Sequence, residues 1–198
     1  VERHDLIVAL GEWVIDASLQ QLGRWQAQGL DLQVSVNIAA RHLQREDFVE
    51  RLRALIDARP NVTVAGRLEL EVVESTAIED MSRIPHLIEE CRALGIGFAI
   101  DDFGIGYSSL TYFKTLPVDT LKIDQSFIRD MLKDPDDLAI VEGVIGLSKV
   151  FRRRVIAEGV ETVEHGIALL GLGSDLAQGW GIARPMPADD FATWVRGW

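Results

Sequence analysis

The chain has 198 residues, of which 47% are hydrophobic and 26% are charged, a composition that excludes disorder and collagen-like structure and supports one substantial core. Lys and Arg number 20 against 31 Asp and Glu, and the net charge of -11 argues against general coating of DNA or RNA. The single cysteine, Cys91, excludes an internal disulfide framework. No apolar run approaches the roughly 18 residues that a bilayer requires. We expect a cytoplasmic protein or the cytoplasmic part of a membrane-anchored one.

Hydrophobic periodicity predicts helices that alternate with short buried strands. The first helix begins at residue 6 and is stopped by Gly29; further helices are expected at 46–58, 84–94, 107–115, 138–150, 163–170 and 189–195. Strands are expected at 32–36, 68–73, 98–100, 120–123, 155–157 and 176–178. This alternation requires a parallel sheet with helices outside it, either open and doubly wound or closed into a barrel. No repeat or linker interrupts the pattern, so a single domain is expected over residues 1–198.

Polar residues at the carboxyl ends of the six predicted strands decide between these two folds. They are Asn37, Glu71, Asp101, Asp102, Lys122, Glu158 and Gln178. An open sheet concentrates its site at one switch point, whereas a closed barrel brings every strand end around one mouth. The pattern therefore favours an α/β fold of the TIM-like (β/α) barrel type. Such barrels have about eight strands, so two further strands are expected to precede Val1 in a larger multidomain protein.

Most of these polar residues are typical ligands of a hard divalent metal. Oxygen donors alone suit Mg²⁺, Mn²⁺ or Ca²⁺ rather than Zn²⁺, and they are offered by Asn37, Glu71, Asp101, Asp102 and Glu158. Adjacent carboxylates at a strand end would hold two ions about 4 Å apart, the arrangement that suits attack on a phosphodiester. Lys122 would orient the attacking water or neutralise a phosphoryl oxygen. Each residue alone is equally consistent with a solvated strand end or a salt bridge. Polar residues recur at the ends of all six predicted strands, however, and this recurrence favours a shared site.

Other titratable residues have simpler interpretations. Glu69 faces the same way as Glu71 but lies deeper, which favours a buried ion pair. The histidines share no spacing and are expected on the surface or on helices rather than as ligands; they are His4, His42, His86 and His165. Cys91 lies in an amphipathic stretch and is expected to be a small core hydrophobe.

Six motifs in this order resemble the EAL-domain family of cyclic di-GMP phosphodiesterases. They are VNIAARHL (36–43), LEVVES (70–75), AIDDFGIGYSSL (99–110), LKIDQSFI (121–128), AEGVET (157–162) and QGW (178–180). The resemblance covers essentially the whole chain and implies a (β/α) barrel. It also implies hydrolysis of cyclic di-GMP to linear pGpG, dependent on two Mg²⁺ or Mn²⁺ ions, with Ca²⁺ inhibitory. A homodimer and sensory or GGDEF domains in the same polypeptide are further expectations of the resemblance.

The resemblance also assigns roles to individual residues. It implies that the metal ligands are Asn37, Glu71, Asp101, Asp102 and Glu158. Lys122 positions the hydrolytic water, and Gln178 lines the site. Glu74 resembles a glutamate that braces the loop after Asp102; the alternative is a carboxylate at a helix start. Glu161 is either a supporting carboxylate or a helix cap near Thr162.

Three departures from the family pattern leave a second function open. No Glu-Ala-Leu motif occurs, and the start of the chain resembles the helix after the strand that carries it, so the fragment is expected to be impaired as an enzyme. Ile105 stands where the family has Thr or Ser, and Val73 stands where it has Thr beside Glu74. The alternative to an enzyme is a catalytically inactive EAL-like receptor for cyclic di-GMP or a protein-interaction module.

Overall fold

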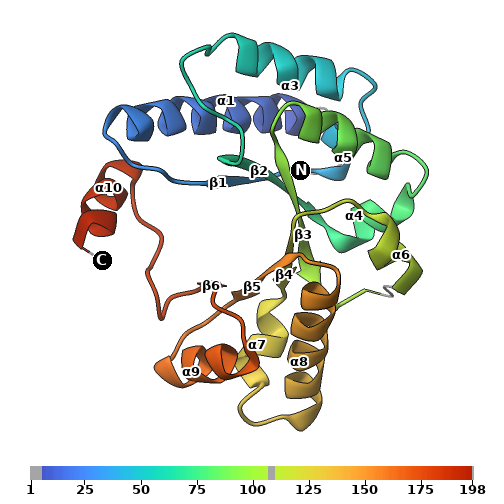
Figure 1. Ribbon diagram of the computed structural model, residues 1–198. Coiled ribbons are helices and arrows are strands. Elements are labelled where there is room, and N and C mark those ends of the chain that lie inside the picture. Colours follow the sequence, from blue (N-terminus) through green and yellow to red (C-terminus); the bar gives the residue numbers. More distant parts are fainter. Residues whose placement is uncertain (1–5, 107–109, 198) are drawn as a thin grey trace. The chain divides into compact units, whose positions relative to one another are not determined.

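The computed structural model describes residues 6–106 and 110–197, which fall into two compact units (Figure 1). The first unit comprises the chain up to Val72, the segment Ser82–Phe98 and the chain from Met186 onward. The second unit comprises Val73–Met81 and Ala99–Pro185. Within the described residues, no helix is both long enough and apolar enough to cross a membrane.

The first unit packs helices against a pair of parallel strands. Its elements are α1 (Leu6–Ala27), β1 (Val34–Asn37), α2 (Ala40–Leu43), α3 (Phe48–Asp57), β2 (Leu68–Val73), α5 (Ile84–Ala93) and α10 (Ala188–Gly197). Helix α1 contacts β1, α2 and α3, and α3 contacts α5. The core face of α1 carries Ile15, Leu19 and Leu22, whereas Leu6 and Trp13, which also show helical spacing, are each 66% exposed. Spacing alone therefore identifies this helix but not the face that it buries.

The second unit is built on consecutive parallel strands. Its elements are α4 (Glu74–Glu79), β3 (Gly97–Phe103, from Ala99), α6 (Leu110–Thr115), β4 (Thr120–Ile123), α7 (Gln125–Asp130), α8 (Pro135–Val150), β5 (Arg154–Glu158), α9 (Val163–Leu172) and β6 (Ala177–Gln178). Strand β4 pairs with β3 on one side and β5 on the other, and β5 also pairs with β6. Every residue of β4 is buried. Helices α7 and α8 lie side by side and both contact β5.

The predicted alternation of helices and parallel strands is confirmed. The strands at 68–73 and 120–123 have the predicted bounds, and the other strands differ by one to three residues at an end. Helix α8 starts three residues earlier than predicted because Asp134 caps it and Pro135 fits its first turn. The short helices α2, α4 and α7 were not predicted, since four to six residues are too few to establish a periodic pattern. Residues 107–109 of the helix predicted at 107–115 lie outside the described residues.

Candidate metal and catalytic site

A β-bulge at the end of β3 brings two consecutive aspartates to one place. Ile100 lies opposite Leu121 and Phe103 lies opposite Ile123, so Asp101 and Asp102 together face the position of Lys122. Asp102 has a backbone φ of 54°, a left-handed conformation that residues other than glycine seldom adopt. On a regular strand these two side chains would point to opposite faces. The bulge and the left-handed residue together explain how both carboxylates reach the same group.

Asp101, Asp102 and Glu158 form a compact carboxylate group around Lys122. One carboxylate oxygen from each of the three residues lies within 4.8 Å of the others. Lys122 Nζ lies 3.0 Å from Asp101 Oδ1 and 2.7 Å from Glu158 Oε1. The Lys122 side chain is only 4% exposed, and the Asp101 and Glu158 side chains are 14% and 17% exposed. The strand ends therefore hold three acids and one base in a partly desolvated site, in which charges interact more strongly than in water.

Burial and neighbouring acids make Asp102 reluctant to ionise. Partial burial raises the pKa of Asp102, and the carboxylates of Asp101 and Asp124 raise it further, whereas the ammonium of Lys122 opposes them. Asp124, directly after β4, also accepts a hydrogen bond from the Ser126 amide (2.8 Å) and caps α7. Asp124 is not among the site residues predicted from the sequence. Its position in the sequence could have indicated its proximity to the site, because an acid that directly follows the strand carrying Lys122 lies at the same strand end.

The chemistry of this group fits a divalent cation. Its three acidic members offer only oxygen atoms, as Mg²⁺ and Mn²⁺ prefer. The buried Oδ1 atom of Asp101 accepts no hydrogen bond from a described residue, although the ion pair with Lys122 partly balances its charge. Three carboxylates against one ammonium leave an excess of negative charge. A cation would relieve that excess and give Asp101 Oδ1 a further partner beside Lys122.

Glu74 connects the start of α4 to the loop after Asp102. Its buried carboxylate accepts hydrogen bonds from the backbone amides of Gly104 (3.1 Å) and Gly106 (3.4 Å). A Cβ atom at Gly106 would lie 3.0 Å from this carboxylate, so the residue must be small for the loop to approach. Glu74 is also the first residue of α4. It is therefore both a carboxylate at a helix start and a partner of the loop after Asp102, the two alternatives considered from the sequence.

The remaining site residues of the second unit lie near the end of β5. Gln178 is the parallel partner of Glu158 and is exposed. Glu161 is also exposed, and the residue that caps α9 is Thr162, whose hydroxyl accepts a hydrogen bond from the His165 amide. Register therefore places Gln178 beside the carboxylate group, whereas the role of Glu161 stays a prediction.

Two candidate ligands belong to the first unit. Asn37 ends β1, and its parallel partner Glu71 lies two residues before the end of β2; Asn37 is exposed, and Glu71 is buried. Their participation in one site with Asp101 stays a prediction. Deeper in β2, Glu69 is 1% exposed and accepts a hydrogen bond from the Ser35 hydroxyl at 3.2 Å.

No described histidine belongs to the acidic group, and His4 lies outside the residues that the structure describes. Among the described residues, the only group suited to a metal consists of carboxylates. His86 is exposed on α5, as expected. His42 and His165 lie on helices as expected but are buried rather than on the surface, and burial lowers the pKa of His42. Cys91 is a buried residue of α5, where burial raises the pKa of its thiol to about 12 and keeps it protonated.

Two residues near this loop, Ile105 and Val73, depart from the family pattern, and the structure shows the surroundings of each. Ile105 is 63% exposed, so its side chain contributes little to the core. Val73 occupies the N-cap position of α4 in an extended conformation, and its side chain makes no capping hydrogen bond. A threonine hydroxyl at that position would accept one, which gives a physical reason for the family preference stated above.

Comparison with known proteins identifies the family. The sequence matches the profile of the EAL domain over residues 1–185, so the chain belongs to the EAL-domain family. It is 40% identical over 191 residues to the bifunctional diguanylate cyclase/cyclic di-GMP phosphodiesterase MucR of Pseudomonas aeruginosa. It is 35% identical over 195 residues to the cyclic di-GMP phosphodiesterase PdeR of Escherichia coli. These alignments include 96% and 98% of this chain but only 28% and 29% of the relatives.

Solved structures agree with this assignment. The c-di-GMP complex of the PaMucR phosphodiesterase matches with a TM-score of 0.89 at 39% identity, over 94% of this chain and 75% of the other. The EAL domain of Mycobacterium smegmatis DcpA matches with a TM-score of 0.91 at 34% identity, over 98% of this chain and 86% of the other. These matches confirm the predicted fold class, that of the TIM-like (β/α) barrel.

Proposed function

We propose that this chain carries the catalytic residues of a metal-dependent phosphodiesterase that hydrolyses cyclic di-GMP to linear pGpG. The observation that carries the proposal is the group of Asp101, Asp102 and Glu158 around the buried ammonium of Lys122. Membership of a family whose relatives include proteins named cyclic di-GMP phosphodiesterases supports the choice of substrate. The reaction adds water to one phosphorus atom, and a ribose oxygen leaves with a proton.

The chain's own residues orient the water and balance charge. The Lys122 ammonium donates toward the attacking water or a phosphoryl oxygen, and its contacts with Asp101 and Glu158 fix its position. A nearby carboxylate accepts a proton from the water as its oxygen approaches phosphorus. Gln178, beside Glu158 in the sheet, offers an amide to the substrate. Glu74 holds the loop after Asp102 through two backbone amides.

The proposed cofactor is a pair of Mg²⁺ or Mn²⁺ ions. Asp101, Asp102 and Glu158 would hold them in the second unit, and Asn37 and Glu71 are proposed as further ligands. When bound, such ions increase the acidity of a coordinated water and stabilise negative charge on the phosphoryl group. They would also offset the repulsion between this acidic site and a doubly anionic substrate. Ca²⁺ is expected to bind but to inhibit, because its coordination is larger and less rigid.

Assembly and domain context are proposals of the same kind. The chain spans less than a third of the two curated relatives described above, so sensory or GGDEF domains are proposed as neighbours in the same polypeptide. A homodimer is proposed through the loop and helix after Asp102. Residues 107–109 of that region lie outside the described residues. A cytoplasmic location is proposed because the proposed substrate, cyclic di-GMP, is an intracellular messenger.

The decisive experiment follows the metal dependence of hydrolysis. The protein is treated with EDTA, and the conversion of cyclic di-GMP to pGpG is measured by chromatography before and after each metal is added. We expect no turnover in EDTA, recovery with Mg²⁺ or Mn²⁺, and no recovery with Ca²⁺. Equal turnover in EDTA would refute the metal mechanism. Binding of cyclic di-GMP that is followed by no hydrolysis even with Mg²⁺ or Mn²⁺ present would favour the receptor alternative.

A further inference from the structure

An exposed tryptophan next to the proposed site pairs with an arginine. Trp180 is 61% exposed, although tryptophan is among the residues that folding usually buries most extensively. The guanidinium carbon of Arg184 lies 4.8 Å from the centre of the Trp180 ring, within the range of a cation–π contact. Such a contact restrains the plane of the ring while most of the residue stays accessible to solvent.

The backbone around Trp180 is held close to the end of β5. A Cβ atom at Gly179 would lie 2.2 Å from the Val160 carbonyl oxygen, and one at Gly181 would lie 2.7 Å from the Glu161 carbonyl carbon. Only glycine permits this approach on both sides of Trp180. The Val160 amide donates to the Gln178 carbonyl (3.0 Å), and the Gly181 amide donates to the Val160 carbonyl (2.9 Å). The tryptophan therefore projects from an anchored segment.

The position of this segment along the sheet relates Trp180 to the acidic group. Gln178 is the register partner of Glu158, one of the three grouped carboxylates, and Trp180 follows two residues later. The flanking glycines are the residues that approach the backbone of Val160 and Glu161. An aromatic surface is thus fixed within two residues of the strand end at which phosphodiester chemistry is proposed.

We propose that Trp180 is a stacking platform for a guanine base of the substrate and that Arg184 is a positioning residue that orients the ring. This inference rests on the proposed function and adds a determinant of substrate binding. Purine bases stack on aromatic side chains, and tryptophan offers the largest such surface. The positive charge of Arg184 also favours a ligand with phosphates in this strongly acidic protein.

Tryptophan fluorescence tests stacking directly. Cyclic di-GMP is titrated in the presence of Ca²⁺, which is expected to bind without supporting hydrolysis, into the parent protein and the variants Trp180→Leu and Trp180→Phe, and its affinity is measured independently by equilibrium dialysis. We expect the parent fluorescence to be quenched on binding and this quenching to be lost in both variants. We expect the dissociation constant to rise at least about fivefold in Trp180→Leu and less in Trp180→Phe, which retains an aromatic ring. Trp13→Leu is the matched control, since Trp13 is 66% exposed on α1.

Kinetics separate base stacking from catalysis. In Trp180→Leu we expect KM for cyclic di-GMP to rise at least about fivefold, while kcat and Mn²⁺ affinity stay within about twofold of the parent values. Arg184→Gln should raise KM by a smaller factor and leave kcat unchanged. Circular dichroism of each variant verifies the fold.

The outcomes distinguish this inference from the proposed function. Equal cyclic di-GMP affinity and quenching in the parent and Trp180→Leu would overturn the platform, whether or not the parent hydrolyses its substrate. A fall in kcat at unchanged KM would also overturn it, because the residue would then act on the reaction rather than on binding. A parent that binds and is quenched but does not hydrolyse would overturn the phosphodiesterase proposal alone. A parent that does not bind cyclic di-GMP would overturn both.

Discussion

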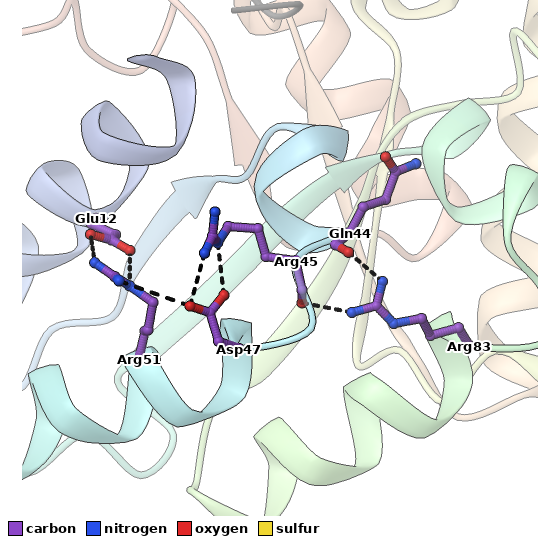
Figure 2. Close-up of polar contacts among 6 residues, drawn as sticks. All are labelled: Glu12, Gln44, Arg45, Asp47, Arg51 and Arg83. Atoms are coloured by element: carbon purple, nitrogen blue, oxygen red, sulfur yellow. Dashed lines mark hydrogen bonds and ion pairs between the residues drawn. The ribbon is translucent and has the colours of Figure 1, made fainter. Parts of the chain in front are cut away.

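Two charged clusters of the molecule differ in how their charges are balanced. On the first unit, Arg51 pairs with Glu12 and lies 3.9 Å from Asp47, and Arg45 contacts Asp47 at 2.7 Å (Figure 2). Arg83 donates to the backbone carbonyls of Gln44 and Arg45, each at 2.6 Å. Each side-chain cation in this network therefore has an anionic or carbonyl partner. Partial exposure to water further reduces the energetic significance of the network.

The carboxylate group of the second unit has the opposite character. Three acids share one ammonium, that of Lys122, and the Lys122 side chain is 4% exposed. Partial burial, followed by the neighbouring like charges, raises the pKa of Asp102, whereas the neighbouring Arg45 lowers the pKa of Asp47 in the first unit. A balanced, exposed network needs no ligand, but a desolvated group with excess negative charge is suited to a cation. Charge balance and burial together, rather than the number of charged residues, distinguish the candidate functional site.

The most severe test of this contrast removes one charge from each cluster. Asp101→Asn keeps the shape of the side chain but loses a proposed metal ligand charge, so we expect cyclic di-GMP hydrolysis to fall by about two orders of magnitude or more. The fold should persist, because the change relieves repulsion among the three carboxylates. Asp47→Asn, in the exposed network, is the control and should retain parental turnover. Turnover of Asp101→Asn within a factor of a few of the parent would make Asp101 a bystander.

A smaller effect is expected from a charge that acts on the site through the loop. Glu74→Gln retains an acceptor but loses the charge that strengthens the hydrogen bonds from Gly104 and Gly106. A hydrogen bond to a charged group contributes about 1.5–3 kcal/mol and a neutral one about 0.5–1.5 kcal/mol, so loss of the charge should cost about 1.4 kcal/mol and decrease turnover at saturating Mn²⁺ by about tenfold. Glu89→Gln, an exposed change on α5, controls for the loss of one carboxylate. Parental turnover in Glu74→Gln would show that the loop does not depend on this charge.

Ile105 allows a test in which activity should increase. Ile105→Thr introduces a hydroxyl into the loop beside the acidic group, and one neutral hydrogen bond of about 0.5–1.5 kcal/mol would raise turnover at limiting Mg²⁺ by about two- to tenfold. Thermal stability should change little, because the residue is 63% exposed. Ile167→Thr on α9, with 65% exposure, is the matched control. An unchanged or lower rate would show that this loop does not use the hydroxyl.

The smallest expected effect concerns stability near the site without a change of charge. Val73→Thr should supply the missing side-chain cap of α4 and raise the free energy of unfolding by about 1 kcal/mol. Denaturant titration measures the difference. Val73→Ala removes the branched side chain without adding a cap and should show no gain. Equal stabilities of the Thr and Ala variants would contradict the capping explanation.

Much of the candidate site was predictable because parallel strands carry their carboxyl ends to the same edge. Asp101, Lys122 and Glu158 each mark the end of a buried segment, and hydrophobic runs locate such segments well. Asp124 and Trp180 were overlooked as site residues for different reasons. Asp124 also fits a helix cap, and an aromatic residue after a strand is expected in a core unless its exposure is known.

The sequence by itself determined the class of elements, their order and the acidic character of the strand ends, because these follow from hydrophobic spacing and residue chemistry. Only the tertiary structure decided that α1 buries the face of Ile15, since packing against β1 and α3 selects one of its apolar stripes. It also decided the bulge that aligns Asp101 with Asp102 and the contact of Glu74 with the loop thirty residues later. Register and long-range approach depend on backbone conformations, such as the left-handed Asp102, that residue patterns do not encode.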